Sequence, residues 1–199
     1  ITANNLDGIY LSGSSNNTLT GNTLSRNVYN FGLSGVSLSH FIHSIDTSNI
    51  VNDKPIYYLI NQTDMVINPE TCPEVGYLGL INCANITVER LNLENNINGL
   101  LLVHTNNSKI AANIIANNWD GICLSNSSNN RIIHNNFINN TIQVHDVSWN
   151  HPSYSPSKNI WDDGVEGNHW SNYTGVDVNH DGIGDSPHLV YANNTDHYP

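Results

Sequence analysis

The protein has 199 residues, a net charge of -11 and only six lysines and arginines. Nucleic-acid-binding proteins need clustered basic residues to displace counterions from phosphates, so this composition excludes that class. The sequence contains 36 asparagines, and asparagine is poor in helix interiors, which excludes a helical bundle. No apolar run reaches the ~20 residues of a membrane helix, and no basic segment leads into an apolar one at the start. We therefore expect neither a membrane span nor a signal peptide in this chain.

The first predicted element, Gly8–Asn27, belongs to a repeat. It aligns without a gap with Tyr77–Asn96, Gly99–Asn118 and Gly121–Asn140, and the last three segments start 22 residues apart. Aliphatic residues two positions apart predict short strands with one buried face. The coils must stack, because one coil cannot bury its apolar face alone. The sequence therefore predicts an all-β fold, a parallel β-helix (solenoid) with coils of about 22 residues.

Two kinds of column in this repeat have different expected roles. We expect the aliphatic columns to stack inside one solenoid, with central members Ile9, Leu11, Leu78, Leu80, Leu100, Leu102, Ile122 and Leu124. Positions 9 and 20 hold asparagine in all four segments. Asparagine tolerates left-handed backbone, and its amide can bond to an amide one strand away, so we expect corners and ladders. A leucine-rich repeat has a similar period, but the helix or extended arc of that fold has no counterpart here.

Residues 30–76 interrupt the repeat. We interpret them as one irregular coil with a protruding loop, inside a β-helix domain of residues 1–145. Between Ile45 and Ile60, the run Val51–Pro55 supplies turn residues between two apolar arms, which predicts a hairpin. His40 and His43 are three residues apart, but no further metal ligands accompany them. Exposed or packing histidines are therefore favoured over a metal site.

The cysteines and the glycosylation sequons bear on the cellular compartment in which the protein is found. Cys72, Cys83 and Cys123 cannot all pair within the chain, although Cys72 and Cys83 could staple a loop. No Cys-X-X-Cys motif indicates a zinc site. Eight Asn-X-Ser/Thr sequons are glycosylation candidates and are compatible with a location outside the cell. They begin at Asn16, Asn61, Asn85, Asn106, Asn126, Asn139, Asn172 and Asn193.

After Thr141 the repeat ends, and we interpret residues 146–199 as a C-terminal cap. Ser148–Lys158 is rich in proline, serine and tyrosine, which is typical of a connection. The end of a solenoid exposes apolar side chains and strand edges, which need a cover. Trp161, Trp170 and Tyr173 are suitable side chains for that cover.

The cap contains a calcium-loop-like motif, because Asp177–Asp185 reads D-x-N-x-D-G-x-G-D. The expected ligands are Asp177, Asn179, Asp181, the carbonyl of Ile183, and Asp185 directly or through water, with Gly182 at the sharp turn. His188 stands where the bidentate glutamate of such loops is expected. A carboxylate from elsewhere would complete the sphere, and the candidates are Asp162, Asp163, Glu166 and Asp196. The sequence thus predicts bound calcium, with a solvated acidic turn as the alternative.

The repeat, best seen in Gly121–Asn140 (GICLSNSSNNRIIHNNFINN), resembles the NosD-like, or CASH-type, right-handed parallel β-helix repeats of archaeal surface proteins. The interruption around Asp46–Leu59 resembles the same group, as do Asn159–Gly164, Gly167–Tyr173 and Asp181–Asp185 in the tail. The resemblance implies the fold over nearly the whole chain. The family name comes from a periplasmic factor in copper delivery to nitrous oxide reductase, and the wider group includes sugar-binding and sugar-cleaving relatives. No motif here matches a catalytic set, so no catalytic residue is carried over.

Three functions follow from these observations. The first is a non-catalytic extracellular or cell-surface module: an envelope component, an adhesin or a self-assembling rod, with carbohydrate as a candidate ligand. The second is a polysaccharide lyase or glycoside hydrolase. A hydrolase needs two carboxylates at a set separation, and the candidates Asp7 and Asp120 share a coil position but stand on non-adjacent coils. The third is handling of copper or another metal. The first is favoured, with self-association or other envelope proteins as the expected partners.

Overall fold

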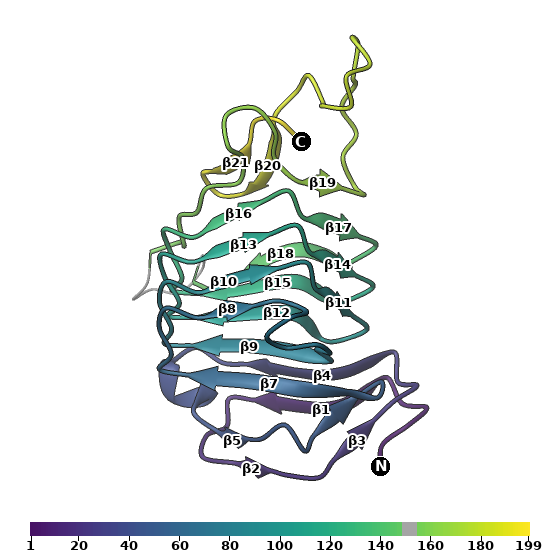
Figure 1. Cartoon of the computed structure of the whole chain (residues 1–199), viewed down its shortest axis with the longest axis vertical. Coiled ribbons are helices and arrows are strands. Elements are labelled where there is room, and N and C mark those ends of the chain that lie inside the picture. The colour runs from purple at the N-terminus through teal and green to yellow at the C-terminus, as the bar shows by residue number, and fades with distance from the viewer. Residues whose placement is uncertain (149–154) are drawn as a thin grey trace.

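The computed structural model describes residues 1–148 and 155–199, and these residues form a parallel β-solenoid (Figure 1). The largest sheet runs in the order β18-β15-β12-β9-β7-β6-β3. Its strands are β3 (Thr23–Leu24), β6 (Ile50–Val51), β7 (Lys54–Ile60), β9 (Tyr77–Ile81), β12 (Asn98–Val103), β15 (Asp120–Ser125) and β18 (Ile142–Asp146). Among the described residues, the one helix is the short 3₁₀ turn η1 (Leu38–Phe41), and no helix is long and apolar enough to cross a membrane.

Two four-stranded sheets form the other walls of the main solenoid. One contains β8 (Val66–Ile67), β10 (Thr87–Glu89), β13 (Lys109–Ala111) and β16 (Arg131–Ile133). The other contains β11 (Asn92–Glu94), β14 (Ile114–Ala116), β17 (Asn136–Ile138) and β19 (His169–Trp170). In Figure 1 their strands lie above one another coil by coil. This arrangement confirms the predicted β-solenoid.

The register of the coils follows the sequence repeat. Leu100 of β12 pairs with Leu78 on one side and Ile122 on the other, and Leu102 pairs with Leu80 and Leu124. All six side chains are fully buried in one hydrophobic cluster. Each is therefore stacked on the equivalent residue of the next coil, as the aliphatic columns predict, because a parallel pairing repeats the same inward face at every turn.

The first 51 residues form a second, smaller set of coils. Parallel pairs join β1 (Asp7–Ser12) to β4 (Tyr29–Ser34), β2 (Thr18–Leu19) to β5 (Ser44–Ile45), and β3 to β6. The chain then reverses through Asn52 and Asp53, both with positive φ, and β7 pairs antiparallel to β6. This confirms the hairpin predicted between Ile45 and Ile60, since two left-handed residues are what a tight hairpin turn needs.

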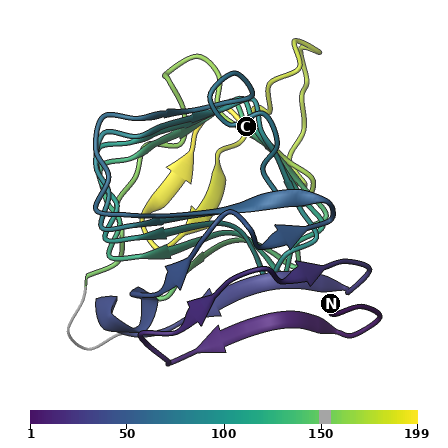
Figure 2. The same ribbon diagram turned by 60° about the horizontal axis from the view of Figure 1, so that its bottom comes forward.

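Strand β4 of the N-terminal coils packs on the outer face of the large sheet (Figure 2), whereas β3 and β6 continue that sheet beyond β7. Phe31 and Leu33 of β4 share a second hydrophobic cluster with Leu101 and Val103, which point away from the main interior. Backbone bonds fix this contact, for example from Ile97 N–H to Phe31 C=O at 2.9 Å. At β12 the large sheet is thus buried on both faces, and for this reason this strand reads as the unbroken apolar run Leu100–Val103 rather than as an alternation.

One expectation about the core is wrong. Ile9 and Leu11 do not stack below Leu78 and Leu80 but pack, half-buried, against the second cluster. The physical reason is the reversal at Asn52, which turns the direction of the chain before the long run of coils begins. The sequence alignment recognised the coil but carried no information about the interior to which it belongs.

Asparagine ladders hold the corners of the coils. Asn118, only 1% exposed, donates its amide to Asn140 Oδ1 at 3.0 Å and accepts a bond from Asn96 N–H at 2.9 Å. The ninth-position residues, such as Asn107 and Asn129, instead adopt positive φ. Both observations agree with the roles expected for asparagine, namely ladder formation and left-handed corners.

Aromatic side chains cover the C-terminal end of the main interior. Trp170 of β19 stacks on Phe137 with ring centroids 4.3 Å apart, and Trp161 and Tyr191 are buried beside it. An antiparallel pair, β20 (His188–Tyr191) and β21 (Asn194–Asp196), closes this end. Tyr173 is half-buried and packs against the same cluster. The middle of the predicted connection, residues 149–154, lies outside the described residues.

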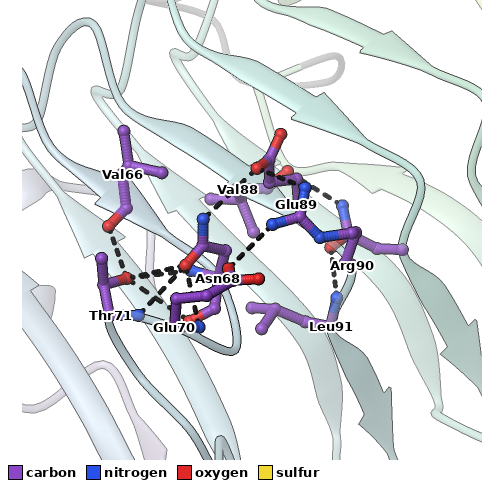
Figure 3. A network of polar contacts seen from close by, with 9 residues as sticks. Val66, Asn68, Glu70, Thr71, Val88, Glu89, Arg90 and Leu91 are labelled. Atoms are coloured by element: carbon purple, nitrogen blue, oxygen red, sulfur yellow. Dashed lines mark hydrogen bonds and ion pairs between the residues drawn. The ribbon is translucent and has the colours of Figure 1, made fainter.

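The loop after β8 is fastened to the neighbouring coil by polar contacts (Figure 3). Asn68 accepts bonds from the Thr71 backbone and donates to Glu89 Oε1 at 3.3 Å. Arg90 lies 2.8 Å from both Glu70 and Glu89. Because the pair of Arg90 and Glu70 is largely exposed, it adds little to the stability of the fold.

Candidate metal centre

Three side chains with metal-binding atoms meet on the outer face of the large sheet: Asp120 and Cys123 of β15, and His145 of β18. One ligand atom from each lies within 4.8 Å of the others, and no other such group of three exists among the described residues. His145 Nδ1 is 3.0 Å from Asp120 Oδ2. Asp120 Oδ1 is buried and has no hydrogen-bond partner. A buried carboxylate oxygen without a partner is costly unless a cation or a proton occupies its surroundings.

The coil register brings these residues together. Cys123 pairs with His145 across the parallel strands β15 and β18, so the two side chains stand on the same outer face at adjacent positions. Asp120 begins the same strand as Cys123. Sequence reasoning missed this group, although a signal was present: His145 follows Cys123 by one repeat length, and extending the alignment beyond Asn140 would have placed them side by side.

Burial and charge set the protonation of the group. Burial raises the pKa of the Cys123 thiol well above its ordinary value, and the nearby carboxylates of Asp120 and Asp146 add to the effect. The hydrogen bond to Asp120 raises the pKa of His145, although burial opposes it. Without a metal, the group therefore favours a neutral thiol and a histidine that readily carries a proton.

A cavity of about 360 Å³ opens over this group, and we call it the interface cavity. The N-terminal coils supply Asp7, Tyr10 and Tyr29, while the main solenoid supplies Trp119 and the three metal-binding side chains. The rings of Tyr29 and Trp119 meet edge to face with centroids 5.9 Å apart. The fold thus places Asp7 and Asp120 on the same cavity, although the sequence put them on non-adjacent coils, because the first coil docks sideways onto the sheet.

The calcium-loop-like residues lie elsewhere, in an exposed loop at the C-terminal end. The Asp177 carboxylate accepts bonds from Asp181 N–H at 3.2 Å and Gly182 N–H at 2.9 Å, and Gly182 has φ of +91°. Asp185 Oδ2 accepts from Val178 N–H at 2.6 Å. The side-chain amide of Asn179 donates to Asp181. The loop therefore curls around its own carboxylates, and Asp177 and Ile183 border a second cavity of about 600 Å³.

The other residues that the sequence singled out are a histidine, two cysteines and the asparagines of the sequons. His43 is buried and bonded to Asn17 N–H and His40 C=O, which fits packing rather than metal binding. Cys72 and Cys83 are buried free thiols, so the disulfide bond that could join them across the loop is not formed. Six of the eight sequon asparagines are exposed, and two, Asn106 and Asn126, are half-buried.

Comparison with known protein families shows to which family this chain is related. The family model described as "Periplasmic copper-binding protein (NosD)" matches residues 58–175. The chain belongs to the NosD family. The matched segment contains Asp120, Cys123 and His145 but not Asp7 or Tyr10. Comparisons of this NosD-family chain with curated proteins and with solved structures give no match.

The donor set of the three-residue group fits the metal that the family description names. A thiolate and an imidazole are favoured copper ligands, and a carboxylate can complete a mixed set for a divalent ion. The unpartnered Oδ1 of Asp120 provides an oxygen that no protein group satisfies. Cys123 would have to lose its proton on binding, so a metal held by this group would release protons and would bind more weakly as the pH falls.

Proposed function

We propose that this chain is a non-catalytic metal-handling module of the extracellular or envelope space. In this proposal it binds copper at Asp120, Cys123 and His145. The observation that carries the proposal is the cluster itself: Asp120, Cys123 and His145 each offer a ligand atom within 4.8 Å of the others, and the Oδ1 atom of Asp120 is buried without a partner. The periplasmic setting in the description of the matched family supports the location.

Copper binding is tested by titrating the full chain with Cu⁺ held by a chromophoric chelator. We expect one tightly bound ion per chain, and Cys123→Ser should weaken its binding on the order of a hundredfold or more, because the only soft ligand is lost. Cys83→Ser is the matched control, since Cys83 is also a buried free thiol but bonds only to backbone carbonyls. Equal affinities of the two variants would contradict the assignment.

Polysaccharide cleavage is the second candidate, favoured by one observation. Asp7 and Asp120 line one cavity together with Tyr10 and Trp119, and glycosidases use two carboxylates across a sugar-binding cleft. Release of reducing ends from acidic or neutral polysaccharides, abolished by Asp7→Asn, would establish this activity. Copper binding with no release of reducing ends supports the non-catalytic proposal.

We also propose that the loop of Asp177, Asn179, Asp181, Ile183 and Asp185 takes calcium and that the exposed sequons carry glycans. The alternating oxygen donors of the loop and the exposure of the sequon asparagines support these two proposals. Self-association and contact with envelope proteins or polysaccharide are proposed for the N-terminal coils. There β1 pairs with β4 alone and β2 pairs with β5 alone. Within the described residues, one edge of β1 and one edge of β2 therefore remain unpaired.

A further inference from the structure

We propose that a metal at Asp120, Cys123 and His145 keeps one open coordination position toward the interface cavity, and that this position takes a neutral imidazole ring. The inference rests on the proposed metal site and specifies its external ligand. The ring could belong to a free small molecule or to a histidine side chain of another protein.

The first argument is the number of protein donors. Three side chains offer ligand atoms within 4.8 Å of one another. The Asp7 carboxylate lines the same cavity but lies outside that group. The Tyr10 hydroxyl bonds to Ser34 Oγ at 2.7 Å, and Asn98 Oδ1 already accepts a bond from Leu33 N–H at 2.9 Å. Metal sites with three protein ligands and an accessible fourth position bind external ligands there.

The second argument is charge. The carboxylate of Asp120 and the thiolate of Cys123 would neutralise a divalent ion and would exceed the charge of Cu⁺, so an anionic fourth ligand would add an uncompensated charge. Asp7 on the cavity wall and Asp146, close enough to act on Cys123, are further carboxylates. The whole chain carries a net charge of -11. This field repels anions such as azide and leaves neutral nitrogen donors favoured.

The third argument is shape. The cavity of about 360 Å³ holds a five-membered ring with a substituent but not a folded chain. Its walls are mostly apolar and include the rings of Tyr10, Tyr29 and Trp119. A flat ring with one nitrogen donor can bind the metal and pack against these aromatic walls at the same time. Imidazole is the commonest biological group with both properties.

The test uses the full chain loaded with Co²⁺, a redox-stable ion whose absorption reports thiolate ligation and coordination. The loaded protein is titrated separately with 4-methylimidazole, with the peptide acetyl-Gly-His-Gly-amide, and with azide. We expect the cobalt bands to shift with an imidazole at concentrations at least about tenfold below those needed for azide. Response to the small molecule alone assigns a free ligand, and response to the peptide as well assigns a histidine side chain.

A variant separates cavity packing from metal binding. Trp119→Ala removes an aromatic wall that is 47% exposed, and it should weaken the imidazole response about tenfold while the cobalt bands persist. If no thiolate–cobalt band forms, this inference is overturned, and the Cu⁺ titration with Cys123→Ser decides the copper site separately. If the band forms but neither imidazole ligand shifts it, or if azide binds as tightly, the metal site stands and this inference is overturned.

Discussion

Replacing Asn118 by alanine removes the central step of an asparagine ladder. Its amide donates to Leu93 C=O and Asn140 Oδ1, both at 3.0 Å, and its oxygen accepts from Asn96 N–H at 2.9 Å. At about 1 kcal/mol net for each hydrogen bond, Asn118→Ala should lower the free energy of unfolding by about 3 kcal/mol. For a chain of this size, that corresponds to a fall in Tm of about 6–12 °C.

The matched control is Asn92→Ala. Asn92 is an exposed asparagine in β11, and its one side-chain bond is to Glu94 at 3.2 Å. Its replacement should change the unfolding free energy by no more than about 0.5 kcal/mol. The assay is urea unfolding followed by circular dichroism, with the slope of the transition compared between variants because solenoids can unfold in parts. Equal midpoints for the two variants would refute the idea that the buried ladder stabilises the coils.

Three further outcomes are expected. Chelation should lower the Tm of the calcium-saturated protein, because a ligand of the native state adds stability; Asp181→Ala should remove that difference, and identical melting curves with and without calcium would leave the loop a plain turn. Burial lowers the pKa of His43, so the stability that neutral His43 contributes is present above the unfolded pKa and is lost as the pH falls through the folded pKa. The urea midpoints at pH 7.5 and 5.5 should therefore differ less in His43→Gln than in the parent protein. An equal difference in both proteins would count against this linkage. Sedimentation across a range of concentrations should show reversible association through the free edges of β1 and β2, and a monomer at every concentration would argue against it.

The group of Asp120, Cys123 and His145 could have been predicted in part from the sequence. The pairing of Cys123 with His145 follows from the 22-residue register alone, because parallel coils place equivalent residues side by side. The alignment stopped at Asn140, where the asparagine and glycine positions lose their pattern, and so His145 was not included. The unpartnered oxygen of Asp120, in contrast, depends on burial that no sequence pattern reports.

The sequence by itself determined the coil. Leucine and isoleucine at alternate positions specify the inward face, and asparagine at fixed positions specifies the corners and ladders, because each of these preferences acts within one coil or between two neighbours. For that reason Leu100 lies between Leu78 and Ile122, as the repeat predicts.

Only the tertiary structure decided how the N-terminal coils are placed. A reversal at Asn52 and Asp53 turns the chain, and the apolar outer face of β12, Leu101 and Val103, then attracts Phe31 and Leu33. This docking creates the interface cavity and brings Asp7 to it. The repeat cannot encode it, since burial of the second face depends on contacts between segments about 70 residues apart, whereas the periodicity reports only which side chains of each strand are apolar.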